Sequence, residues 1–247
     1  MSDHVKIRIK FQKTRAIRYI GHLDVMRFYQ KCIRRAQIPV CYTGGFSPHQ
    51  MLTFAAPLSV GLESYGEYLD VEVESITTSE DFIRRLNEAS IPEIKIVSVK
   101  RLPENAGNAM ASVAAAGYKV QFRDDGCPGL FTGSDDEINA CLNDFMGLSQ
   151  IPYEKEGKKG VREVDLRPGI FSLLWHPDSH SIEMLLDASS GDNVKPAQVL
   201  DALLSRYSQK LASNALKIVR LDTYTRLPSE NDEPGKLVSM DEIGECF

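Results

Sequence analysis

Two histidines and two carboxylates in the first seventy residues have the types needed for proton transfer. His22 and Asp24 belong to the string Gly21–Asp24, His49 closes a glycine-rich stretch, and Glu67 follows it. An imidazole takes up and releases a proton near neutral pH, and a neighbouring carboxylate orients it. These four residues are therefore the candidates for catalysis. A structural role is the alternative, because a carboxylate such as Asp24 in a first helical turn complements the helix dipole.

Basic residues dominate the first fifty positions. Ten Lys/Arg face two acids there, which gives +8 in a chain whose net charge is −5 and leaves −13 for the rest. A local excess of this size favours a polyanionic partner. A solvated helix face is the structural alternative. The side chains that we expect to contact phosphates are Arg15, Arg18, Arg27, Lys31, Arg34 and Arg35.

The segment 42–49 combines glycines, aromatic rings and a histidine. Gly44 and Gly45 permit a close approach of the backbone to a ligand, while Tyr42 and Phe46 offer faces on which bases stack. His49 adds a titratable donor. The spacing is not that of a phosphate-binding P-loop. A long loop between two strands is the structural alternative.

Other chemistries lack their signatures. The chain has no HExxH, GxGxxG or Ser/His/Asp pattern, and its five cysteines show no CxxC spacing. We therefore expect no metal site and no iron–sulfur cluster in this chain. Unclustered cysteines, no apolar run near the roughly 20 residues of a membrane span and an N-terminus that runs directly into a strand pattern predict a cytoplasmic protein without a signal peptide.

Hydrophobic periodicity predicts the elements that position these residues. Alternation predicts a strand over 5–11, and a 3.6-residue period predicts a helix over 22–36. Two strands, a helix opened by Thr78 and Asp81, and a last strand follow at 51–58, 69–73, 78–89 and 94–99. The order β-α-β-β-α-β predicts a ferredoxin-like module over 1–101.

In that module the first and third strands are antiparallel neighbours. Their polar rows would then form cross-strand ion pairs, which neutralise part of the positive charge. The rows are Lys6, Arg8 and Lys10 on one strand and Asp70, Glu72 and Glu74 on the other.

The second half of the chain repeats this architecture. A linker over 102–116 precedes a second module over 117–225, with strands near 118–122, 151–154, 161–166, 171–175, 182–186 and 216–221. Helices follow Ser134 and Pro196. The predicted fold is α+β: two tandem ferredoxin-like modules with antiparallel sheets, the second with an extra strand. Residues 226–247 are acidic and lack periodicity, which predicts a flexible tail.

Several spaced motifs resemble a known family. They are Gly21-His22-Leu23-Asp24-x-x-Arg27, Arg34-Arg35-Ala36-x-x-Pro39, Tyr42-x-Gly44-Gly45-Phe46-Ser47-Pro48-His49, Ala56-Pro57-Leu58-x-x-Gly61-x-x-Ser64-x-x-Glu67-Tyr68-x-Asp70 and Val164-Asp165-Leu166-Arg167-Pro168-x-Ile170. Together they resemble the radical-SAM-associated (radical-SAM-linked) protein family, a bacterial domain of uncharacterised function. The resemblance covers roughly residues 5–225.

The resemblance implies a partner. That partner is a radical-SAM enzyme, which would carry S-adenosylmethionine and an iron–sulfur cluster; none of these cofactors is expected in this chain. The gene neighbourhood of the family, near ribosomal-protein and ribonuclease genes, implies an RNA such as tRNA or rRNA.

Three hypotheses follow. The leading one is an auxiliary RNA-binding subunit that presents structured RNA to the partner enzyme, with the six cations on phosphates, Tyr42 and Phe46 on a base, and His22 and His49 in directional contacts. The second is an enzyme in its own right that uses His22 and His49, oriented by Asp24 or Glu67, on RNA or on a phosphorylated substrate. The third is a protein–protein adaptor for the radical-SAM enzyme.

Overall fold

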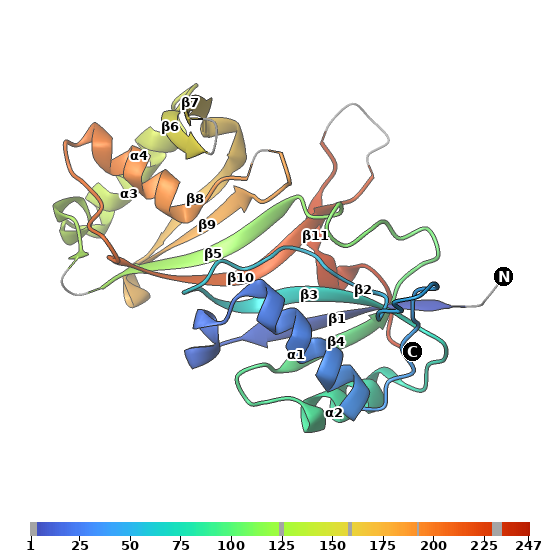
Figure 1. The fold of residues 1–247 in the computed structure, drawn as a ribbon. Coiled ribbons are helices and arrows are strands. Elements are labelled where there is room, and N and C mark those ends of the chain that lie inside the picture. The colour runs from blue at the N-terminus through green and yellow to red at the C-terminus, as the bar shows by residue number, and fades with distance from the viewer. Residues whose placement is uncertain (1–3, 124–125, 158–159, 192, 229–233) are drawn as a thin grey trace. The chain divides into compact units, whose positions relative to one another are not determined.

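The computed structural model describes residues 4–123, 126–157, 160–191, 193–228 and 234–247 of the 247-residue chain. These residues form a mixed α+β fold with four α-helices and a nine-stranded, mostly antiparallel sheet. The predicted α+β class is confirmed. The backbone divides into two compact units. Figure 1 shows the chain coloured by residue number. We call residues 1–114 with 220–247 the terminal unit and residues 115–219 the central unit.

The terminal unit is built from both ends of the chain. Its strand order is β4-β1-β3-β10, with β2 also paired with β3 and β11 with β10. The last strand of that order, β10, starts in the central unit and enters the terminal unit at Arg220. The elements are β1 (Val5–Lys13), α1 (His22–Arg35), β2 (Leu52–Phe54), β3 (Glu63–Val73), α2 (Ser79–Ala89), β4 (Ile96–Arg101), β10 (Leu216–Arg226) and β11 (Leu237–Ser239).

The alternation along β1 separates a core face from a polar face. Ile7, Ile9 and Phe11 are almost completely buried and pack with α1 and α2, which cover the same face of the sheet (Figure 1). β1 pairs with β3 in antiparallel register, as predicted. An alternating strand of this kind buries every second side chain, so the intervening cations must lie on the other face.

The cations on that other face do not all pair with the predicted acidic row of β3. Arg8 lies opposite Asp70, and its Nε and Nη2 donate to the carboxylate at 2.8 and 2.9 Å. Lys10, however, lies opposite Tyr68 and pairs with Asp222 at 2.9 Å. Arg8 and Asp70 are also closed to solvent, because their side chains are only 3% and 5% exposed.

The C-terminal segment buries this polar face. β11 pairs with β10, Val238 and Met240 are buried, and the Met240 carbonyl accepts from Arg8. The expectation of a flexible tail over 226–247 is wrong for this segment, because two apolar side chains in an acidic sequence are enough to anchor it. Residues 229–233 of that range lie outside the described residues.

The central unit has its own core. Its order is β10-β5-β9-β8, and β6 and β7 form a separate two-stranded sheet. α3 begins with a capping box in which Ser134 and Glu137 bond reciprocally, as their spacing predicts. The elements are β5 (Ala115–Phe122), α3 (Asp135–Met146), β6 (Pro152–Gly157), β7 (Gly160–Asp165), β8 (Ile170–His176), β9 (Ser181–Asp187) and α4 (Pro196–Arg206).

The boundaries of the observed units differ from those of the predicted modules. The expected linker over 102–116 ends earlier, because β5 begins at Ala115, and the expected second module over 117–225 loses the end of β10 to the terminal unit. The element order of 1–101 is the predicted one. The assignment of both halves to ferredoxin-like modules stays a prediction, since β10 and β11 extend one sheet and β6 and β7 pair apart from the other.

Candidate nucleic-acid interface

Helix α1 carries the basic side chains that remain accessible. Its buried side consists of Val25, Tyr29, Cys32 and Ile33, so the residues between them face solvent. Lys31, Arg34 and Arg35 are exposed near the helix C-terminus, where cations interact favourably with the helix dipole. None of the three has a carboxylate within ion-pair distance among the described residues. These three side chains are called the α1 basic face below.

Carboxylates neutralise much of the remaining N-terminal charge. Arg27 pairs with Asp24 at 3.2 Å on the exposed surface of α1. Arg18 pairs with Glu63 at 3.0 Å, and its guanidinium lies 4.8 Å from the centre of the Tyr19 ring. Together with the pairs of Arg8 and Lys10, this leaves a smaller positive surface than the sequence predicts.

Arg15 and Arg18 lie apart from the α1 basic face along the chain. Both belong to a 3₁₀ turn over Arg15–Tyr19, ahead of α1, and Arg15 is exposed in a left-handed backbone conformation with φ of 54°. The six predicted phosphate ligands therefore fall into two groups, with Arg15 and Arg18 before α1 and the other four on it.

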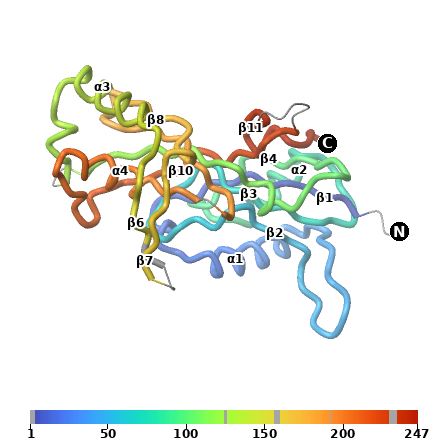
Figure 2. Tube along the Cα trace, turned by 90° about the horizontal axis from the view of Figure 1, so that it is seen from above, coloured from blue at the N-terminus to red at the C-terminus, as the bar shows by residue number. Residues whose placement is uncertain are grey.

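The segment 42–50 is a projecting loop with its two ends joined. Tyr42 and Gln50 form a β-bridge, and the Thr43 and His49 backbones are linked by a 2.9 Å hydrogen bond. The His49 N–H also donates to Thr43 Oγ1 at 3.1 Å. Figure 2 shows this light-blue loop extending away from α1 and β2. Phe46 lies at its tip with a fully exposed side chain, next to Gly45, whose φ of 98° favours glycine.

A chain of hydrogen bonds joins the loop to the α1 basic face. The backbone carbonyl of Gln30 accepts from Arg34 Nε and from Gln50 Nε2, each at 3.3 Å. Gln50 Nε2 also lies 3.4 Å from the hydroxyl of Tyr42, which is 48% exposed. Through these bonds, the guanidinium of Arg34 and the phenol ring of Tyr42 lie on the same side of the terminal unit.

The two histidines are not brought together. The His22 ring meets the Phe54 ring edge to face at a centroid distance of 5.1 Å, on the core side of β2. His49 lines a pocket together with Thr53. Because neighbouring strand residues point to opposite faces, Thr53 and Phe54 place the two imidazoles at opposite faces of the sheet. Asp24 is paired with Arg27.

Glu67 belongs to a buried charge cluster. Its carboxylate accepts from Arg220 Nη1 at 3.0 and 3.2 Å, and both side chains are 7% exposed. Lys13 is buried beside them and donates to the Ile20 carbonyl at 2.7 Å. Burial lowers the pKa of Lys13, and the charge of Glu67 partly offsets that effect. Glu67 is therefore engaged with cations and orients neither histidine.

Two further members of this cluster, Arg220 and Tyr29, were not predicted from the sequence. The Tyr29 side chain is completely buried, and its hydroxyl has no hydrogen-bond partner among the described atoms. Burial raises the pKa of Tyr29 well above its usual value. A lone arginine in a late strand carries no sequence signal that it meets a glutamate 153 positions earlier.

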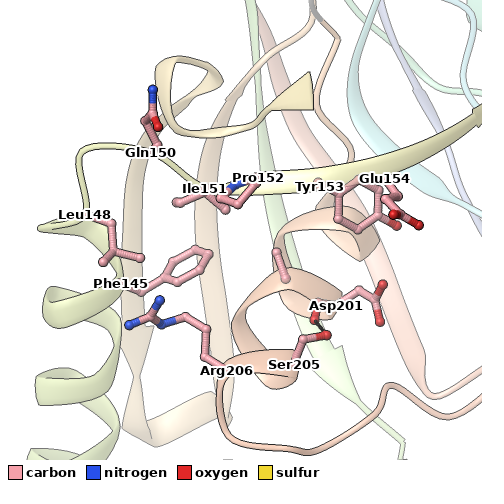
Figure 3. A pocket seen from close by; sticks show the side chains of 11 residues that line it. Phe145, Leu148, Gln150, Ile151, Pro152, Tyr153, Glu154, Asp201, Ser205 and Arg206 are labelled. Atoms are coloured by element: carbon pink, nitrogen blue, oxygen red, sulfur yellow. Dashed lines mark hydrogen bonds between the residues drawn. The ribbon is translucent and has the colours of Figure 1, made fainter. Parts of the chain in front are cut away.

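A separate pocket of about 530 Å³ lies in the central unit (Figure 3). Arg206 approaches Phe145 and Leu148 at one side, whereas Asp201 and Ser205 lie at the other side. None of the residues that the sequence singles out for binding lines this pocket. We therefore place the candidate interface at α1 and the 42–50 loop, where charge and rings adjoin.

The described residues contain no group of three or more metal-ligating side chains. Among the same residues, every helix is too short or too polar to cross a bilayer.

A family model described as "Uncharacterized protein conserved in bacteria (DUF2344)" matches residues 6–196. No curated protein matches the sequence. The matched range includes α1, the 42–50 loop and Glu67, but it ends before Arg220.

Proposed function

The chain belongs to DUF2344, a family of proteins conserved in bacteria, and we propose that it binds RNA as a non-catalytic, auxiliary subunit. The α1 basic face would contact phosphates, and the rings of the 42–50 loop would stack on bases. RNA with exposed bases is the preferred class, because proteins read unpaired bases by stacking and by their edges.

One observation carries the proposal. The shared carbonyl of Gln30 links Arg34 to Gln50, and Gln50 contacts Tyr42, so the cationic row adjoins the base of the aromatic loop. Single-stranded nucleic acid is bound by this combination, in which cations follow the backbone and rings take the bases. A helix face that is merely solvated would not require a neighbouring loop whose tip exposes an entire phenylalanine ring.

The partner belongs to the same proposal. The resemblance to radical-SAM-associated proteins supports a modification enzyme that carries S-adenosylmethionine and an iron–sulfur cluster, with tRNA or rRNA as the shared substrate. Tandem ferredoxin-like modules would suit such a carrier, although fold alone implies no function. In this arrangement the present chain would hold the RNA and the partner would react with it.

The salt dependence of RNA binding tests the proposal. Each phosphate neutralised on a single strand contributes about −0.7 to the slope of log K against log salt. Three contacts from the α1 basic face predict a slope of about −2 for the natural chain. The double variant Lys31→Glu/Arg34→Glu should bind a single-stranded RNA more weakly and flatten the slope to about −0.7.

A charge-matched variant is the control. Lys95→Glu/Lys217→Glu changes the net charge equally, and both lysines are exposed outside the candidate interface. It should retain most of the affinity and the slope. Equal losses in the two double variants, or binding by the natural chain that salt does not weaken, would remove the proposal.

An exposed apolar patch favours an adaptor as the second candidate function. Tyr19, Ile20, Leu23 and Val60 are 38–61% exposed, and the hydrogen bond from Gly61 N–H to the Arg18 carbonyl brings their two segments together. Contiguous apolar surface of this kind often marks a protein contact. Co-purification of a partner that survives ribonuclease treatment, without RNA binding by the isolated chain, would favour this candidate.

A further inference from the structure

A small polar pocket opens at the base of the 42–50 loop. Its volume is about 280 Å³, and its wall comes from four parts of the terminal unit: the polar face of β1 and β3, the loop base, β2 and the segment before β5. Its polar lining includes Lys6, His49, Gln50, Glu72 and Asn108. A pocket this size suits one planar ring system rather than a drug-sized ligand.

The pocket wall holds hydrogen-bonding groups that the protein leaves available. Lys6 and Glu72 lie opposite each other in the β1–β3 register, yet no ion pair within 4.0 Å joins them among the described residues. The carboxylate of Glu72 has only a distant contact with His4, at 3.8 Å. Asp70, by contrast, is fully engaged with Arg8.

The side-chain amide of Gln50 also lines the pocket. Gln50 is 6% exposed, and its Oε1 is buried without a hydrogen-bond partner among the described atoms. A buried acceptor that lacks a donor destabilises the fold. Its Nε2 is fixed by the Gln30 carbonyl, so the side chain cannot turn over to relieve the loss. Because that oxygen is itself buried, Gln50 forms part of the pocket wall and does not offer its oxygen to a ligand.

The remaining groups include donors. His49 Nδ1 lies 3.1 Å from Thr43 Oγ1, which leaves the other ring nitrogen for a ligand. Asn108 Oδ1 accepts from the Met110 N–H at 2.9 Å, which leaves the amide NH₂. With Lys6, the pocket therefore offers the carboxylate of Glu72 as an acceptor, and an ammonium and an amide as donors.

We propose that this pocket holds a guanine base of the bound RNA. Guanine alone among the four bases presents two adjacent donors, N1–H and the 2-amino group, which a carboxylate such as that of Glu72 accepts together. Its O6 and N7 are acceptors for Lys6 and Asn108. Adenine, cytosine and uracil each lack the paired donors. The inference rests on the proposed function, because the guanine belongs to the same RNA whose bases stack on the rings of the 42–50 loop.

Competition between short RNAs tests the pocket in the intact chain. The probes are two uridine octamers, one with a single central guanosine and one with a single central adenosine. One good bidentate contact to a base discriminates by about tenfold or more, so the guanosine octamer should bind that much more tightly. Glu72→Gln should abolish the preference and leave the affinity for the adenosine octamer unchanged.

The matched control is Glu74→Gln, an exposed carboxylate two residues farther along the same chain segment. It should keep the guanosine preference. Folding of Glu72→Gln is protected, because the hydrogen bonds of residue 72 to Met51 and Cys41 come from the backbone. Lys6→Met provides a second variant from the opposite strand, and it should also lower the preference.

The outcomes separate this inference from the proposed function. RNA binding with equal affinity for both octamers would overturn the guanine pocket and leave the RNA-binding surface intact. Binding of neither octamer, with no binding of guanosine 5′-monophosphate, would overturn both. Binding of guanosine 5′-monophosphate but not of the octamers would support the pocket and remove the RNA-binding function.

Discussion

Phe46 exposes its entire ring at the tip of the 42–50 loop, where it contributes nothing to the core. An apolar side chain in water has no stabilising role of its own, which makes a binding role the economical explanation. The hydrogen bonds between Thr43 and His49 hold the loop ends together and present the ring without support from neighbouring side chains.

Replacing this ring should weaken RNA binding without altering electrostatics. Stacking on one aromatic side chain contributes about 1–3 kcal/mol per base, so Phe46→Ala should lower the affinity for single-stranded RNA about tenfold. The slope of log K against log salt should not change, because the ring carries no charge. Phe46→Trp should retain the affinity. A titration at several salt concentrations checks both points, and a similar loss for Trp would contradict stacking.

Residue patterns predicted the accessible cations only in part. The helical period over 22–36 correctly placed Lys31, Arg34 and Arg35 on the solvent side of α1. It could not show that Lys10 meets Asp222, because that partner lies 212 positions away in a strand whose place in the sheet no local pattern reveals. The position of Gln50 beneath Gln30 depends on the same kind of distant packing.

At the scale of single elements, the helix starts were the most predictable features. Thr78 accepts from the Asp81 N–H, and Ser134 and Glu137 form the reciprocal box that their three-residue spacing predicts. These bonds are local, so four consecutive residues determine them. The separate β6–β7 pair was not predicted, because strand periodicity does not specify which strand is the neighbour.

The box at α3 gives the central unit a pH-dependent contribution to stability. The Ser134 backbone N–H donates to Glu137 and lowers the pKa of that carboxyl below its usual value of 4.5. A carboxyl whose pKa is lower in the folded state stabilises above its unfolded pKa, and this contribution disappears as the pH falls through the folded pKa. Glu137→Gln should therefore destabilise at pH 7, and its difference from the natural chain should shrink as the pH is lowered from 7 to 3.

Urea unfolding at both pH values measures that difference. Ser134→Ala should cost about 1 kcal/mol at pH 7 through loss of the cap. Glu163→Gln is a suitable control, since Glu163 is an exposed strand residue with no described ion pair. A difference between Glu137→Gln and the natural chain that persists unchanged at pH 3 would contradict the role of the ionised carboxylate.

At the scale of the whole molecule, the two units differ in how the chain builds them. The central unit is one continuous stretch, whereas the terminal unit needs residues from both ends. Sequence periodicity predicts the element order. It also predicts two consecutive modules, which places the end of β10 in the second module and all of β11 in the tail. Val238 and Met240 were the available signal, but two apolar residues are too few to establish a period.

Met240 should be essential to the terminal unit. Its side chain is completely buried, and replacing a buried methionine by alanine costs about 2–5 kcal/mol. Met240→Ala should reduce the protection of backbone amides in β1 and β3 against hydrogen exchange, while β8 and β9 in the central unit keep theirs. Met110→Ala, at a side chain that is 52% exposed, is the control and should change neither.

The split origin of the terminal unit also sets an order for its biosynthesis. Synthesis proceeds from the N-terminus, so the residues of β1 and β3 are made long before the C-terminal residues that bury Arg8 and Asp70. The nascent N-terminal half must therefore wait, with a polar sheet face open, until Met240 and then Phe247, whose ring packs 5.6 Å from that of Phe82, have emerged. A chain that stopped short of Met240 would keep this polar sheet face exposed, and cellular proteases could recognise it.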